Sequence, residues 1–145
     1  MDAVPYPERV ERRMQIGEVA EQIGLSLRTI RYYDEIGLAP PTARTPGGFR
    51  LYTDEDVARL LLVKRMKPLG YSLEEMRDLV ELMDALASEE REDERAELLG
   101  RVELWEQAVA ERVAALRQQL SYAEEFSSRV AGEKERRRAR TAPRA

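Results

Sequence analysis

Hydrophobic residues recur with a helical period in two short stretches near the start of the chain. The first stretch has apolar residues at i, i+3, i+4 and i+7, namely Ile16, Val19, Ala20 and Ile23. Gly24 suits the left-handed conformation that ends a helix, and Ser26 is a good N-cap for the next helix. Ile-Gly-Leu recurs at residues 36–38 and predicts the end of that second helix, since Pro40 and Pro41 cannot continue it. Helix, glycine turn and helix at this spacing predict a helix-turn-helix.

A change to a period of two predicts a β-hairpin over residues 45–53. Pro-Gly-Gly at residues 46–48 supplies the turn. The strand after it alternates, so Arg50 and Tyr52 share one face, and Phe49 and Leu51 share the other. Arg50 is therefore a candidate contact of this wing to a nucleic-acid backbone, whereas Tyr52 supports the wing from inside.

Two capping boxes predict two further helices. Thr53 with Asp56 begins the first of them, which ends near residues 68–70. Ser72 with Glu75 begins the second. Its apolar face is expected to consist of Leu73, Met76, Val80 and Met83.

A seven-residue repeat begins at Leu99 and continues for more than four heptads. Its two series are Leu99, Glu106, Val113, Leu120, Ser127 and Val102, Val109, Leu116, Ala123, Val130, and eight of these ten positions are apolar. This pattern predicts a coiled coil. The candidate dimer-interface residues are Leu99, Val102, Trp105, Val109, Val113, Leu116 and Leu120. The alternative is an amphipathic helix that lies on its own domain; the intermolecular interpretation is favoured because the preceding residues already close a core.

The predicted fold class is mainly α. A winged helix-turn-helix domain with a small β-hairpin wing is expected over residues 14–87, and a coiled-coil dimerisation helix over residues 88–131. Residues 1–13 contain two prolines and no period, which predicts a disordered extension. Residues 132–145 are expected to form a basic disordered tail.

The charge of the chain is unevenly distributed. The net charge is −4, but residues 26–67 contain 8 basic and 5 acidic residues. Residues 81–132 contain 6 basic and 13 acidic residues, and residues 133–145 contain 6 and 2. Because local charge governs the approach to a polyanion, the negative net charge of the whole chain does not exclude DNA binding.

The residue types that are absent exclude several functions. Without cysteine and histidine the chain has no disulfide, no thiolate metal site and no histidine general base, so we expect no enzyme activity, no cofactor and no bound metal. No apolar run approaches 18 residues and no signal peptide is evident, so we expect a cytoplasmic, nucleoid-associated protein that makes no contact with a membrane.

The second helix of the helix-turn-helix is the candidate DNA-recognition element, because a short helix of this kind fits the major groove. Arg28, Arg31 and Tyr32 lie at i, i+3 and i+4 and share one face. Arginine bonds guanine or phosphate, and the tyrosine hydroxyl bonds phosphate. The opposite face is expected to pack on the first helix through Leu27 and Ile30. Two alternatives stay open: the arginines are ordinary surface charges, and Tyr33 is a half-buried core residue.

The stretches MQIGEVAEQIGLSLRTIRYYDEIGL and GGFRLYTDEDVARLLLVKRMKPLGYSLEEM resemble the MerR family of bacterial transcription regulators, over about residues 14–83. The resemblance implies that the long helix pairs antiparallel with that of a second copy. It also implies DNA contacts from Arg28, Thr29, Arg31, Tyr32 and Tyr33 in the helix pair, from Arg50 in the wing, and from Lys67 or Tyr71 in a second wing. Pro68 departs from the usual pattern of that second wing.

Members of that family distort an overlong promoter spacer so that RNA polymerase engages both promoter elements. The implied partners are double-stranded promoter DNA, a second copy of the chain and, indirectly, RNA polymerase. Family effectors bind beyond the dimerisation helix, where little chain follows Val130, and the metal and redox branches use cysteine. A small organic ligand, or no effector, is therefore expected. An effector-independent architectural DNA-binding protein of the same fold and a coiled-coil adaptor that recruits a partner protein remain as alternatives.

Overall fold

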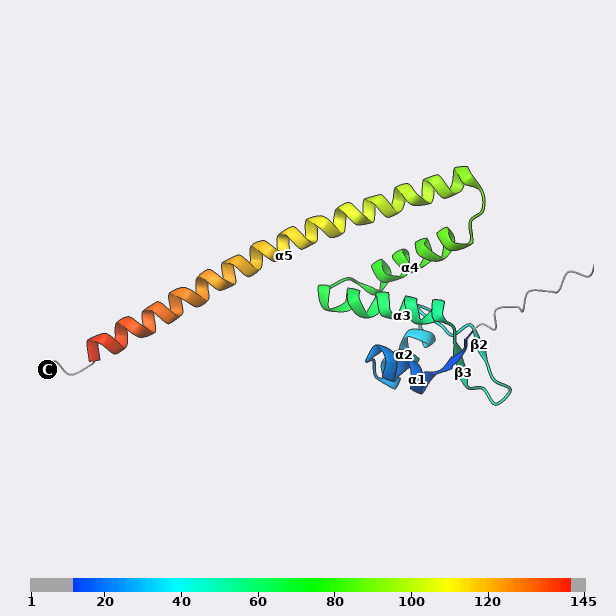
Figure 1. Ribbon diagram of the computed structural model, residues 1–145, viewed down its shortest axis with the longest axis horizontal. Coiled ribbons are helices and arrows are strands. Elements are labelled where there is room, and N and C mark those ends of the chain that lie inside the picture. Colours follow the sequence, from blue (N-terminus) through cyan, green and yellow to red (C-terminus); the bar gives the residue numbers. More distant parts are fainter. Residues whose placement is uncertain (1–11, 142–145) are drawn as a thin grey trace, which may run out of the picture. The chain divides into compact units, whose positions relative to one another are not determined.

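The computed structural model describes residues 12–141, and the chain divides into two units after Ser88 (Figure 1). Within residues 12–88, the first unit contains four α-helices, one 3-10 turn and a small three-stranded sheet. The second contains one long helix. This arrangement confirms the mainly α fold class with a small β wing.

Helices α1 (Ile16–Ile23) and α2 (Leu27–Glu35) form the predicted helix-turn-helix. Gly24 has φ 71° and its N–H donates to the carbonyl of Ala20 at 2.9 Å, as expected of a left-handed helix end. Ser26 caps α2 by accepting from the N–H of Thr29 at 3.1 Å. Ile30 is fully buried, whereas Leu27 is 40% exposed, so the face predicted to pack on α1 is fully covered at Ile30 and only partly covered at Leu27. Leu27 is the first residue of α2.

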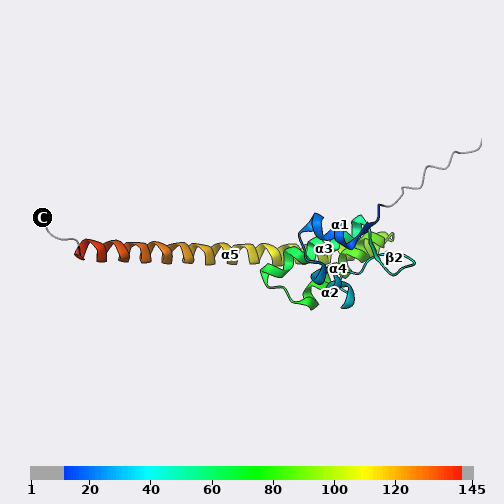
Figure 2. The ribbon, with the colours of Figure 1, turned by 90° about the horizontal axis from the view of Figure 1, so that it is seen from below.

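The sheet has the strand order β1-β3-β2 and both of its pairings are antiparallel. β2 (Ala43–Arg44) and β3 (Arg50–Tyr52) form the predicted hairpin. β1 (Met14–Gln15) pairs with the other edge of β3, with Met14 opposite Tyr52. A two-residue strand is too short to show a period, so β1 was not predicted from the sequence. In Figure 2 the wing lies at one end of this unit, beside α1–α4.

Helices α3 (Asp54–Met66) and α4 (Leu73–Ser88) begin at the two predicted capping boxes. In the first, Thr53 and Asp56 bond each other's backbone N–H; in the second, Ser72 and Glu75 do the same. Between the helices lies the 3-10 turn η1 (Lys67–Leu69). The expected apolar face of α4 is correct in its middle but not at its ends, because Met76 and Val80 are buried whereas Leu73 and Met83 are 41% and 37% exposed.

One core holds the first unit together. Its fully buried large side chains come from every helix and from two strands: Met14, Val19, Ile30, Tyr33, Tyr52, Leu60, Val63, Met76 and Leu82. The helix-turn-helix and the wing therefore share one hydrophobic core.

Helix α5 (Glu92–Thr141) is continuous over 50 residues and has no buried residue (Figure 1). It extends to Thr141, so the prediction of disorder from residue 132 was wrong for residues 132–141. Glu133 pairs with Arg136 at 2.7 Å and with Arg137 at 3.1 Å, spacings that stabilise a helix. Residues 142–145, and most of the predicted N-terminal extension, lie outside the described residues. No helix within residues 12–141 is long and apolar enough to cross a membrane.

Candidate nucleic-acid interface

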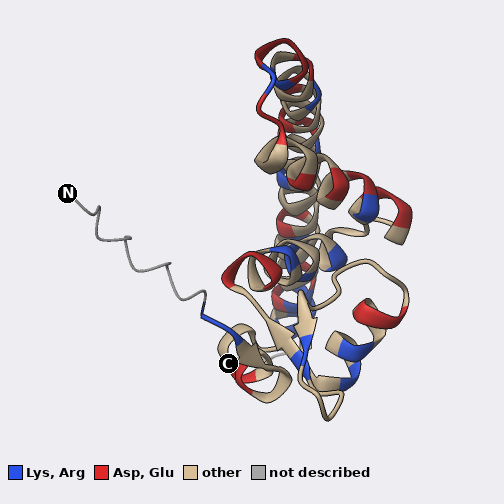
Figure 3. Cartoon of the chain, turned by 90° about the vertical axis from the view of Figure 1, so that its right-hand side faces the viewer, with Lys and Arg blue, Asp and Glu red and all other residues tan. Residues whose placement is uncertain are grey.

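Helix α2 presents a basic and aromatic face. Arg28 and Arg31 are exposed and Tyr32 is 45% exposed, as the helical spacing predicts. Thr29 is partly buried, and its hydroxyl accepts from that of Ser26 at 2.8 Å. Figure 3 shows basic positions on this helix and on the strands of the wing. This face can donate several hydrogen bonds to base edges or phosphates.

The two adjacent tyrosines of α2 have different environments. Tyr33 is 2% exposed, so its ring belongs to the core, the alternative that the sequence left open. Its ring centroid lies 5.8 Å from that of Tyr32 at an interplanar angle of 45°. Burial, and secondarily Tyr32, raises the pKa of the Tyr33 hydroxyl, which favours its neutral form. Tyr33 thus supports the ring that Tyr32 presents.

Asp34 joins the recognition helix to the wing. Its carboxylate accepts from Nη2 of Arg44 at 2.8 Å and from Nε of Arg50 at 2.6 Å. The side chain of Asp34 is 9% exposed and that of Arg50 is 21% exposed. The hydrogen bond from Arg50 to Asp34 raises the pKa of Arg50. Asp34, Arg44 and Arg50 thus form a clamp that orients the wing arginines. The sequence predicted Arg50 as a direct DNA contact but did not predict this clamp. The only signal for it in the sequence was an acidic residue directly after Arg-Tyr-Tyr.

The tip of the wing is a tight turn that carries an exposed aromatic ring. The N–H of Thr45 donates to the carbonyl of Phe49, and that of Gly48 donates to the carbonyl of Thr45, both at 2.8 Å. Gly48 has φ 86°, a conformation that favours glycine. Phe49 is 66% exposed. Phe49 therefore joins the candidate interface, although the sequence analysis gave it no role.

Two cationic side chains hold the C-terminal ends of the helix-turn-helix. Nζ of Lys64, on α3, donates to the carbonyl of Ile23 at 2.5 Å. Arg77, on α4, donates to the carbonyls of Ile36 at 2.8 Å and Gly37 at 3.3 Å. Cations at helix C-termini satisfy the last carbonyls and interact favourably with the helix dipole. These bonds fix α1 and α2 on the core that also supports the wing.

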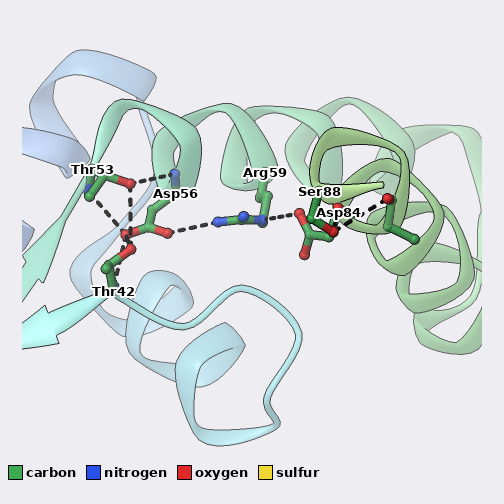
Figure 4. A network of polar contacts seen from close by, with 7 residues as sticks. Thr42, Thr53, Asp56, Arg59, Asp84 and Ser88 are labelled. Atoms are coloured by element: carbon green, nitrogen blue, oxygen red, sulfur yellow. Dashed lines mark hydrogen bonds and ion pairs between the residues drawn. The ribbon is translucent and has the colours of Figure 1, made fainter. Parts of the chain in front are cut away.

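A buried carboxylate anchors the other side of the wing (Figure 4). Asp56 is 3% exposed and accepts from the N–H and hydroxyl of Thr42, the N–H of Thr53 and Nη1 of Arg59. Nε of Arg59 donates to Asp84 at 2.6 Å. The segment that enters β2, the start of α3 and the end of α4 are thereby connected by one polar network.

The candidate second wing lies on the turn between α3 and α4. Lys67 is exposed and belongs to η1, and Tyr71 is partly buried. Pro68 occupies the start of the 3-10 turn, which ends at Gly70 with φ 81°. The proline thus fits a turn here and leaves the ammonium group of Lys67 accessible.

The candidate dimer residues form an open stripe on α5. Leu99, Val109, Val113, Leu116 and Leu120 are 39–59% exposed. Val102 and Trp105 are partly buried. In the described part of the chain, no group of three or more acidic residues could hold a metal ion.

Residues 14–82 match the family model described as the MerR helix-turn-helix regulatory protein. The mercuric resistance operon regulatory protein of Bacillus cereus is 42% identical over 72 residues, which cover 50% of this chain and 54% of that protein. The transcriptional regulator YfmP of Bacillus subtilis is 45% identical over 69 residues, 47% of this chain and 49% of that protein. The chain thus spans about half the length of these curated relatives.

A solved structure extends the likeness beyond this domain. It is HiNmlR, a MerR family regulator lacking the sensor domain, bound to promoter DNA. The match has a TM-score of 0.65 and 28% identity, and covers 86% of this chain and 94% of that one.

Proposed function

Because the chain belongs to the MerR family of transcription regulators, we propose that it binds an inverted-repeat promoter operator as a homodimer. The observation that carries the proposal is the exposed face of α2 with Arg28, Arg31 and Tyr32, joined by Asp34 to a two-arginine wing. A two-fold dimer presents one such helix per half-site, at a separation near one helical turn of DNA or a multiple of it. The similarity to a regulator bound to promoter DNA supports this arrangement.

Each exposed group of the interface has a distinct role in the proposal. Arg28 reads a base edge, whereas Tyr32 and Arg31 bond phosphates. Arg50 uses one nitrogen for Asp34 and offers its other donors to the DNA backbone. Lys67 or Tyr71 adds a phosphate contact from the second wing.

The bound operator is distorted in this proposal. The two DNA-binding domains of the dimer hold their half-sites at a separation that straight DNA does not match, so the duplex bends and untwists at its centre. Such bending costs about 1–6 kcal/mol, which the wing contacts to phosphate offset. The distortion lets RNA polymerase engage both promoter elements.

The regulator responds to a small organic compound or to no effector. An open groove of about 320 Å³ between α3 and α4 is large enough for a small ligand. Its lining combines apolar residues, including Leu62, Val80 and Met83, with the charged residues Glu55, Arg59 and Asp84. Because Arg59 already pairs with Asp84, an apolar compound, or one whose cation approaches Glu55, fits best. The likeness to a regulator that lacks a sensor domain supports the effector-free alternative.

The DNA-binding proposal is tested on an operator selected from random duplexes, with affinity measured by fluorescence anisotropy. Arg28→Ala should cost about 1–3 kcal/mol and relax the preference at one base pair. Tyr32→Phe should weaken selected and unselected duplexes alike, since phosphate contacts carry no sequence information. The control Arg101→Ala, on α5, should bind as wild type. Wild-type affinity and selectivity in both α2 variants would exclude α2 as the recognition helix.

The distortion is tested separately. Circularly permuted fragments bearing the operator should migrate with a mobility that depends on its position. Substitutions at central, uncontacted base pairs should alter affinity. A complex that migrates as straight DNA and tolerates every central substitution would refute bending while leaving sequence-specific binding intact.

A further inference from the structure

The apolar stripe of α5 selects one alignment of two antiparallel helices. In an antiparallel coiled coil, each a position of one chain faces a d position of the other. The two seven-residue series allow this for alignments that differ by one heptad. One of them uses all ten positions, with Leu99 opposite Val130 at its ends and Val113 opposite Leu116 at its centre.

The same alignment also accommodates Glu106 and Ser127, the two polar residues among the ten a and d positions. It places Glu106 opposite Ala123, whose small side chain leaves the carboxylate a route to solvent, and Ser127 opposite Val102. A shift of one heptad in either direction instead places Glu106 opposite Leu116 or Val130. Placing a carboxylate against a large apolar side chain without a partner is unfavourable.

The charges at the two ends of α5 select this alignment independently. Residues 89–95 contain five acidic and two basic residues, and residues 134–140 contain five basic and one acidic residue. In the ten-position alignment residues 92–95, at the start of α5, lie along residues 134–137 of the other chain, and residues 138–140 extend toward residues 89–91, which immediately precede α5. A parallel pair would instead bring like-charged segments together at both ends. With the helix shifted by one heptad, residues 134–140 face either residues 82–88, before α5, or residues 96–102, which have no net charge.

The acidic segment carries negative charge that its own chain leaves incompletely balanced. The neighbouring carboxyl of Glu89 raises the pKa of the Glu94 carboxyl, first through a shared hydrogen bond and then through charge repulsion. Arg91 pairs with Glu94 at 2.7 Å, but both side chains remain well exposed. A basic segment from a second chain would relieve this repulsion.

We propose that two copies of this chain pair through α5 in the antiparallel alignment that sets Leu99 opposite Val130, with the basic end of each helix docked along residues 89–95 of the other. The inference rests on the proposed homodimer and specifies its alignment. An a–d layer beyond the apolar seam then pairs Glu92 of one chain with Arg137 of the other. The intervening layer places Arg95 near Lys134, and in its own chain Arg95 donates to the carbonyl of Glu89 at 3.3 Å.

Cysteine crosslinking of the full chain tests the alignment, since the chain has no cysteine of its own. Leu99→Cys combined with Val130→Cys should give a disulfide-linked dimer on mild oxidation. An intrachain bond is excluded, because the two positions are about 46 Å apart on one helix. Leu99→Cys with Ala123→Cys, and Val102→Cys with Lys134→Cys, report the two alignments shifted by one heptad, and Leu99→Cys alone reports a parallel pair. Efficient linkage in any of these three, and not in the first, would overturn the proposal.

Charge reversal tests the ends of the helix. Arg137→Glu should raise the dimer dissociation constant about tenfold in sedimentation equilibrium at low salt. Arg136→Glu is a matched control, because Arg136 bonds the same Glu133 and changes the net charge equally but lies on the outward face of the helix. Adding Glu92→Arg to Arg137→Glu should restore dimer affinity, while circular dichroism monitors helix content.

The outcomes separate this alignment from the proposed function. A wild-type chain that sediments as a monomer at every concentration refutes the homodimer itself, and the alignment with it. A wild-type dimer in which Arg136→Glu and Arg137→Glu act alike refutes the end pairing. If Arg137→Glu leaves dimer affinity intact and weakens binding to operator DNA, the basic segment contacts phosphate and the proposal fails.

Discussion

Replacing Asp34 by asparagine should loosen the wing and weaken DNA binding together. The carboxylate is nearly buried and holds Arg50 at 2.6 Å and Arg44 at 2.8 Å. A hydrogen bond between charged groups at a partly buried site contributes about 1.5–3 kcal/mol. The contact to Arg44 contributes less than about 1 kcal/mol, since that side chain is 48% exposed. Asparagine keeps the shape and one acceptor oxygen, so we expect the free energy of unfolding to fall by about 1.5–3 kcal/mol.

The effect on DNA affinity follows from the position of the wing. With Asp34→Asn, Arg50 must be ordered by the DNA itself, and the cost of ordering lowers affinity. Removing a negative charge from this side of the molecule acts in the opposite direction by reducing repulsion of phosphates. Glu35→Gln isolates that electrostatic gain, because Glu35 is the next residue of α2, is exposed and loses the same charge.

Urea denaturation and fluorescence anisotropy on a selected operator measure the two quantities. Asp34→Asn should be less stable than Glu35→Gln and should bind DNA more weakly than Glu35→Gln at equal salt. Its stability deficit should persist at high salt, since nearly buried charges are screened little. Equal stability and equal affinity of the two variants would show that the clamp does not position the wing.

Three further perturbations test the core, its tyrosine and the stripe on α5. Asp56→Ala should lower the free energy of unfolding by about 3–5 kcal/mol in urea denaturation, because it leaves the backbone N–H groups of Thr42 and Thr53 and Nη1 of Arg59 without their acceptor. Asp54→Ala, exposed on the same helical turn, should lower it by less than about 1 kcal/mol. Similar losses in the two variants would show that the network does not stabilise the fold. Burial raises the pKa of Tyr52 to about 12. The stability that this raised pKa contributes is therefore complete below pH 10 and is lost between about pH 10 and 12, because the unfolded chain ionises first. Tyr52→Phe should reduce the dependence of the unfolding free energy on pH in that range, and an unchanged dependence would contradict the assignment. Val109→Glu should give a monomer at micromolar concentration by ultracentrifugation, since a buried unpaired carboxylate costs several kcal/mol, and an unchanged sedimentation coefficient would favour a helix that folds back on its own domain.

Local signals along the chain predicted where most helices begin and end. Ser26, Thr53 and Ser72 cap helices through bonds that span three residues, and Gly24 ends a helix through its own backbone conformation. Such features are local: both partners of each bond lie within a few residues in the sequence, so the bond can be predicted from the sequence. The residues that face DNA and those that would form the dimer remain predictions, derived from helical spacing and from the family resemblance.

The side chains that hold these elements in position are evident only in the folded molecule. Asp34 binds arginines 10 and 16 residues away, and Lys64 caps a carbonyl 41 residues away. The sequence has many acids and bases at comparable separations, and periodicity does not say which of them meet. A helical period also did not decide between Tyr32 and Tyr33, because neighbouring residues on a helix point about 100° apart and only the packed core selects which ring is buried. Long-range contacts of this kind form only when the whole chain closes around its core, so they leave no local pattern from which to predict them.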